Sequence, residues 1–115
     1  MNMTNLQRLM LETKGIDLDQ NELAVYLEEN GLKAHDEYNP QSATAKRNIY
    51  KTALSILESI ANNVQLMKTY KLDDMTVTDF HENLLNRIDQ LERKIRSMKT
   101  DEENQQDNVF MLFNS

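Results

Sequence analysis

Several side chains of types that often carry out chemistry occur in this sequence, and their spacing can be tested against known sites. His81 and Glu82 begin like the zinc motif of metalloproteases, in which a second histidine follows the first by four residues. Leu85 stands at that position, so the spacing argues against a zinc site. We predict that His81 is a partly buried polar residue of a helix and that His35, beside two acidic residues, is an exposed loop residue.

Two clusters of charged residues also fail to match a known phosphate or cation site. Lys46, Arg47 and Lys51 lie near the expected start of a helix, where backbone N–H groups favour phosphate. Cations are disfavoured there unless they are paired, so we predict salt bridges to neighbouring helices or subunits. Asp73 and Asp74 could offer oxygens to a cation, but the fixed oxygen spacing of a calcium loop is absent. We predict that they cap a helix.

The composition excludes further classes of site. There is no cysteine, so thiol nucleophiles, disulfides, zinc ribbons and iron-sulfur clusters are excluded. No Ser/His/Asp order and no glycine-rich phosphate loop is present. We therefore predict no enzymatic activity, no metal and no cofactor.

The charge and hydropathy patterns narrow the possible partners. The chain has 13 basic and 19 acidic residues and a formal net charge of −6, which argues against nonspecific binding to phosphate backbones or anionic membranes. We also predict no specific nucleic-acid binding. Its longest apolar runs, 23–27 and 109–113, have five residues, against about 20 for a membrane helix. The first 14 residues lack the apolar centre of a signal peptide. These features predict a soluble cytoplasmic protein with no membrane partner.

The fold class follows from the turn and strand formers. Two glycines, one proline and three phenylalanines are few for a β domain. We predict an all-α protein, a small bundle of about four helices with a long C-terminal amphipathic helix. We predict that residues 1–99 form the helical domain and that residues 100–115 form a flexible acidic linker with an apolar C-terminal arm.

The first half of the chain predicts two short helices. Thr4 is placed to cap the first, and Gly15 to end it. Asp19 and Glu22 have the spacing of a capping box for the second helix, which Asn30 and Gly31 end. Both helices are short enough to need packing onto something larger.

The third predicted helix supplies most of the core. It follows the turn at Asn39 and Pro40, with Ser42 as its cap. Its apolar positions cover more than one stripe, so it should contact neighbours on at least two sides. The predicted core residues are Ile49, Ala53, Ile56, Leu57 and Ile60. Beyond Asn62 and Asn63, residues 65–75 are predicted to be a helical extension followed by an extended loop.

The last helix is expected to run to about Lys99, with Thr76 or Thr78 among its caps. Its apolar positions alternate at spacings of four and three residues, the register of an amphipathic or coiled helix. They are Val77, His81, Leu84, Ile88, Leu91, Ile95 and Met98. Of these, Leu84, Ile88, Leu91 and Ile95 are predicted core residues. Acids placed four residues before arginines predict exposed pairs, Asp89 with Arg93 and Glu92 with Arg96.

An apolar run follows the acidic linker. Its residues are Val109, Phe110, Met111, Leu112 and Phe113. Such a run is a liability in water unless it docks. It could fold back on its own core, or act as a tethered arm that binds a neighbouring subunit or partner protein.

The pattern between Tyr38 and Arg96 resembles a known class of proteins. The residues that carry it are Tyr38-Asn39-Pro40, Arg47 with Tyr50, residues 53–61, the 70–77 connector, and Asn83-Leu84 through Ile95. In helix order and pattern they resemble the small head-tail connector proteins, also called adaptor or head-completion proteins, of long-tailed phages and related prophages.

The resemblance implies a largely α-helical subunit that assembles into a ring, often of twelve copies, beneath the portal. Its partners would be the portal protein and a tail-side completion protein, with DNA passing through the ring. It would act in the host cytoplasm during assembly and then in the virion neck. The charge excess leaves an alternative, a small acidic helical regulator that binds a basic protein surface. A simple helical dimer is a third possibility.

Overall fold

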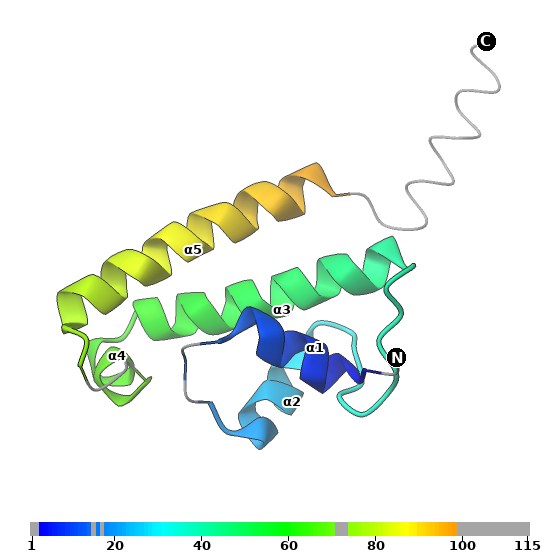
Figure 1. The fold of residues 1–115 in the computed structure, drawn as a ribbon, viewed down its shortest axis with the longest axis horizontal. Helices are drawn as coiled ribbons and strands as arrows, with labels where there is room; N and C mark the ends of the chain where they lie inside the picture. Colours follow the sequence, from blue (N-terminus) through cyan, green and yellow to red (C-terminus); the bar gives the residue numbers. More distant parts are fainter. Residues whose placement is uncertain (1–2, 15, 17, 71–73, 99–115) are drawn as a thin grey trace, which may run out of the picture.

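The computed structural model describes residues 3–14, 16, 18–70 and 74–98, and these residues form an all-α protein. The described part contains five helices (Figure 1): α1 (Asn5–Glu12), α2 (Gln20–Glu29), α3 (Ala43–Ala61), α4 (Val64–Tyr70) and α5 (Val77–Ser97). The predicted class and the long C-terminal amphipathic helix are confirmed. None of the described helices combines the length and apolar character that crossing a bilayer requires.

Helix α3 is the centre of the bundle. The long helix α5 packs along one side of it, and the α1–α2 pair packs against it from another side (Figure 1). The short helix α4 contacts both α3 and α5 near the connection between them. α3 therefore has neighbours on more than one side, as its broad apolar surface predicts.

The core lies where these helices meet α3. Seven of the nine residues predicted for it are buried: Ile49, Ala53, Ile56, Leu57, Ile60, Leu84 and Leu91. Ile88 and Ile95 are partly exposed and pack against its edge. Leu9 and Leu27 bring α1 and α2 into the same core. The two short helices thus gain the tertiary packing that their length requires.

The start of α1 is tied to the loop that precedes α3. Thr4 caps the helix as predicted, and Thr4 and Gln7 form a capping box. The backbone N–H groups of Asn5 and Leu6 donate to carbonyl oxygens of the loop, at 2.9 Å each. These bonds satisfy donors that a helix start leaves open, so the loop is built into the fold.

The capping box predicted for α2 is wrong. Asp19 is the N-cap residue, but its side chain makes no capping hydrogen bond. The carboxylate of Glu22 instead accepts a hydrogen bond from the Tyr70 hydroxyl, at 3.0 Å. A contact between α2 and α4 has replaced the local one. At the other end, Gly31 has φ +82°, the conformation that favours glycine after a helix.

The segment after Asn62 forms a separate helix, α4, and this raises the number of helices from about four to five. The side-chain oxygen of Asn63 accepts hydrogen bonds from the backbone of Gln65 and Leu66, at 2.9 and 3.3 Å. An asparagine that bonds the following backbone in this way begins a new helix. Ser42 caps α3 as predicted. Gly15, the predicted end of α1, lies outside the described residues, and α1 ends at Glu12 with Thr13 as its C-cap.

The buried stripe of α5 differs from the predicted seam at its N-terminal end. Phe80 is buried with Leu84 and Leu91, whereas His81 is half-buried. A helix turns about 100° per residue, which places Phe80, Leu84 and Leu91 within about 40° of each other and His81 about 100° from Phe80. A strict seven-residue register drifts around a straight helix. His81 is therefore partly buried, as predicted, and Phe80, which the predicted seam omits, joins the core.

Thr76 is the N-cap of α5, because its side chain accepts a hydrogen bond from the backbone N–H of Asp79 at 3.0 Å. We expect Thr76→Ala to lower the free energy of unfolding by about 1 kcal/mol. Thr78→Ala, within the exposed first turn, serves as the control and should cost less than about 0.5 kcal/mol. Urea unfolding followed by circular dichroism measures both. Equal losses would contradict the assignment of Thr76 as the cap.

Candidate functional site

The C-terminal end of α1 is joined to the middle of α5 by a cluster of charged side chains. The Glu12 carboxylate pairs with Arg8 at 3.0 Å and with Arg87 of α5. Arg87 also donates a hydrogen bond to the backbone carbonyl of Glu12, at 3.3 Å. That carbonyl belongs to the last turn of α1, where oxygens lack helical partners and cations are favoured. Arg87 therefore closes α1 and holds it against α5.

Arg8 is held from two sides. Its guanidinium lies 5.6 Å from the ring centre of Tyr38 and 5.7 Å from that of Tyr50. Burial acts to lower the pKa of Arg8, but the hydrogen bond and the charge of Glu12, together with Tyr38, outweigh burial, so its pKa lies above the ordinary value. On the same Tyr50 ring, the Lys94 ammonium of α5 lies 4.9 Å from the centre. These cation–π contacts make Tyr50 a link between α1, α3 and α5.

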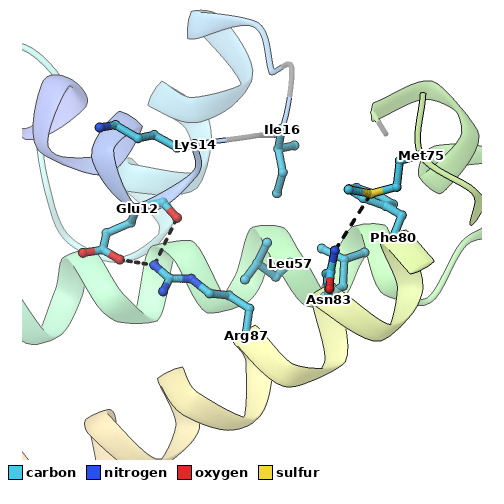
Figure 2. A pocket seen from close by; sticks show the side chains of 9 residues that line it. Glu12, Lys14, Ile16, Leu57, Met75, Phe80, Asn83 and Arg87 are labelled. Atoms are coloured by element: carbon cyan, nitrogen blue, oxygen red, sulfur yellow. Dashed lines mark hydrogen bonds and ion pairs between the residues drawn. The ribbon is translucent and has the colours of Figure 1, made fainter. Parts of the chain in front are cut away.

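A pocket of about 250 Å³ opens beside this cluster, and we define it as the α1–α5 pocket. Figure 2 shows Arg87 and Glu12 on one side of it, Ile16 above, Leu57 of α3 at the back, and Met75, Phe80 and Asn83 on the other side. Leu84 and Lys14 complete the lining. The lining is apolar at the floor, where Leu57, Phe80 and Leu84 are buried, and charged at one rim.

The pocket is suited to holding an apolar side chain. An engineered cavity of about 150 Å³ can bind a benzene molecule, so about 250 Å³ accommodates one aromatic ring. Ligand sites for larger molecules are usually above about 300 Å³. Within the described residues, no three His, Asp or Glu side chains are grouped to hold a metal ion. The size and the apolar floor of the pocket suit the docking of an apolar side chain.

The structure separates the charged residues that the sequence singles out. His35 is exposed in the loop before α3, and His81 lies on the flank of α5. Asp74 lines a shallow acidic concavity with Asp79 and Glu82, close to the start of α5. Asp73 lies outside the described residues. The cap of α5 is Thr76, so the predicted capping by Asp74 is not what begins the helix.

The basic cluster at the start of α3 makes no ion pair with the described part of the chain. Lys46 and Lys51 are exposed, and Arg47 is half-buried. The Nε atom of Arg47 is buried without a hydrogen-bond partner among the described residues. The predicted salt bridges to neighbouring helices are therefore not formed within this region. On α5, Asp89 and Arg93 form the predicted pair at 3.1 Å.

Glu92 and Arg96, which the sequence predicts as a pair, form no ion pair among the described residues. This agrees with the small gain in stability that an exposed ion pair provides.

The predicted partner-binding residues Val109, Phe110, Met111, Leu112 and Phe113 lie outside the described residues. The sequence reasoning also missed Glu12, Arg87 and Lys14. Arg8 and Glu12 are four residues apart, a spacing that predicts a helical pair. No local signal joins Glu12 to Arg87, which is 75 residues away in the chain. Only the packing of both α1 and α5 on α3 brings the two together.

Comparison with protein-family models, with curated proteins and with solved structures finds no match to this chain. The resemblance to phage connectors is therefore carried by the residue pattern from Tyr38 to Arg96 alone. Most of that pattern falls on α3 and α5, the two helices that form the centre of the bundle.

Proposed function

We propose that this chain is a structural subunit of a phage neck, a ring-forming connector that joins the portal of the DNA-filled head to the tail. The observation that carries the proposal is the α3–α5 pair. The residues of the connector-like pattern lie mainly on these two helices, and they pack against each other along their length. This packing uses the apolar side of α5 within the subunit and leaves its opposite side for contacts between proteins.

The outer side of α5 supports this assignment. Its exposed residues are mostly polar or charged, with Leu85 as the large apolar exception at 49 % exposure. The apolar seam is occupied within the bundle, so the helix is not free to form a coiled coil through it. A ring requires two different contact surfaces on every subunit. The outer side of α5 and the arm at 109–113 are the surfaces we assign to that role.

The charge balance suits a channel for DNA. A formal net charge of −6 disfavours binding to phosphate, so DNA could pass the ring without being retained. The proposed partners are the portal protein on the head side and a completion protein on the tail side. By resemblance, the ring would contain about twelve subunits. The protein would assemble in the host cytoplasm and remain in the virion neck.

We expect replacement of both Phe110 and Phe113 by serine to weaken binding to the portal encoded in the same phage genome. Burial of a phenylalanine side chain contributes about 1.5–3 kcal/mol, so losing two should weaken binding at least about a hundredfold. Sedimentation velocity of the mixed proteins measures the affinity, and negative-stain microscopy shows whether a ring forms. Asn114→Ser, in the same segment, is the matched control and should bind as the unmodified chain does.

Unchanged portal binding by the double variant would contradict the role of the arm. Failure of the unmodified chain to bind portal at all would contradict the connector assignment.

A second function is favoured by a specific observation. Asp74, Asp79 and Glu82 line one concavity, and Glu22 and Glu29 line another, so two hollows of the surface are acidic. A small regulator that binds a basic protein surface would use such sites. Salt separates the two functions, because attraction between exposed charges is screened at high ionic strength and an apolar interface is not. Partner binding that falls steeply with salt would favour the regulator.

A further inference from the structure

The α1–α5 pocket differs in charge from two other concavities of the described surface. Among the described residues, its lining includes two cations, Lys14 and Arg87, and one carboxylate, Glu12, which is already paired with arginines. Arg87 lies at the rim, whereas the Lys14 side chain extends away from the centre of the pocket (Figure 2). The groove between α2 and α4 is lined by Glu22 and Glu29, and the hollow beside α5 is lined by three acids. An acidic segment with apolar side chains is therefore repelled by two of these sites and accepted by one.

The chain itself contains an acidic segment with apolar side chains. Val109–Phe113 is an unbroken apolar run, and residues 100–108 before it hold four acids. No lysine or arginine follows Lys99. The apolar side chains match the floor of Leu57, Phe80 and Leu84, while the preceding acids match Arg87 at the rim and the nearby charge of Lys14.

The segment is long enough to reach the pocket. Arg87 precedes Met98, the last described residue, by 11 positions, which is about 16 Å along a helix. Phe80, at the far side of the pocket, is about 27 Å from Met98 by the same measure. Residues 99–108 can span up to about 33 Å when extended. A linker that spans two sites also raises the local concentration of the segment to about the millimolar range.

We propose that the α1–α5 pocket holds the Val109–Phe113 segment of its own chain in the free subunit. The inference rests on the proposed function in one respect, since it describes how the arm assigned there to partner binding is kept before assembly. A phenylalanine ring occupies the apolar floor, and the acids of the linker face Lys14 and Arg87. The portal then competes with the pocket for the same segment.

The absence of native cysteine permits a direct test on the full chain. Asn114→Cys marks the arm, and a second cysteine is placed either at Asn83, on the pocket lining, or at Gln90. Both sites lie on α5, both are exposed, and their seven-residue separation puts them on the same side of the helix. Gln90 is about 10 Å closer to the arm along the helix. An undirected arm would reach Gln90 first.

We expect the Asn83→Cys chain to close its intramolecular disulfide about tenfold faster than the Gln90→Cys chain, because docking concentrates the arm at the pocket. Replacing Phe110 and Phe113 by serine should reverse this preference. Lys14→Glu should reduce it, whereas Lys51→Glu, the same charge change on an exposed residue of α3, should leave it unchanged. Mass spectrometry of the oxidised protein identifies the linked peptides, and circular dichroism confirms that each variant is folded.

If the chain that keeps Phe110 and Phe113 forms its intramolecular disulfide faster with Gln90→Cys than with Asn83→Cys, the proposal is overturned. Predominant disulfide-linked dimers in dilute protein would also overturn it, because the arm would then occupy a second copy. Portal binding is measured separately. A chain that binds portal but shows no preference for Asn83 would retain the connector role and lose this inference. A preference for Asn83 without portal binding would support this inference and contradict the connector role.

Discussion

Leu91→Ala should lower the free energy of unfolding by about 2–5 kcal/mol, the range for removing a buried leucine side chain from a packed core. Leu91 is 1 % exposed and lies on the side of α5 that joins the core. The cost combines the lost burial of the removed carbons with the cavity that remains. In a domain of about 100 residues, each kcal/mol lowers Tm by roughly 4–8 °C.

Leu85→Ala is the matched control, because it makes the same change on the same helix. Leu85 is 49 % exposed, so its truncation should change stability by less than about 1 kcal/mol. Urea unfolding monitored by circular dichroism measures both variants at equal protein concentration. Similar losses at the two positions would show that α5 does not pack on α3 through Leu91. A loss at Leu85 that grows with protein concentration would reveal self-association through the outer side of α5.

Glu12→Gln should lower the free energy of unfolding by about 1–3 kcal/mol, the cost of losing charged hydrogen bonds and leaving their donors poorly satisfied. The carboxylate pairs with Arg8 and Arg87, and the side chains of Glu12 and Arg8 are each only 15 % exposed. Arg87 is 39 % exposed and can turn to water, while Arg8 keeps its two tyrosine rings. The loss should therefore stay below that of a fully buried pair.

Glu29→Gln is the control for this charge change, because Glu29 is exposed on α2. It should alter stability by less than about 0.5 kcal/mol. A double-mutant cycle of Glu12→Gln with Arg87→Ala isolates the contact between α1 and α5, and a coupling above about 0.5 kcal/mol is expected. Additive losses in the cycle would mean that the two residues do not stabilise the fold through each other.

The helices could be predicted from the sequence because the signals for them are local. Thr4 and Ser42 cap α1 and α3, and both are seen directly in the order of the residues. Asn63 shows the limit of such signals. The same asparagine pair could interrupt one helix or begin another, and the bonds from its side chain to Gln65 and Leu66 determine that it begins α4.

The α1–α5 pocket could not be predicted because its lining comes from three helices and the segments between them. Glu12 and Arg87 are far apart in sequence, and no residue spacing predicts that they form a pair. Lys14 and Ile16 follow α1, and no sequence motif predicts that they line a pocket. The chemistry of the pocket exists only when α1 and the first half of α5 both pack on α3, with the pocket between them.

The sequence alone determined the all-α class, the central role of α3 and the amphipathic character of α5, because periodic burial and capping depend on residues a few positions apart. The tertiary structure decided that Phe80 joins Leu84 and Leu91 in the core, that Glu22 bonds Tyr70 instead of capping α2, and that the Glu12–Arg87 pair borders an apolar floor. These outcomes depend on which helix faces which, and that choice is made by packing the whole chain at once.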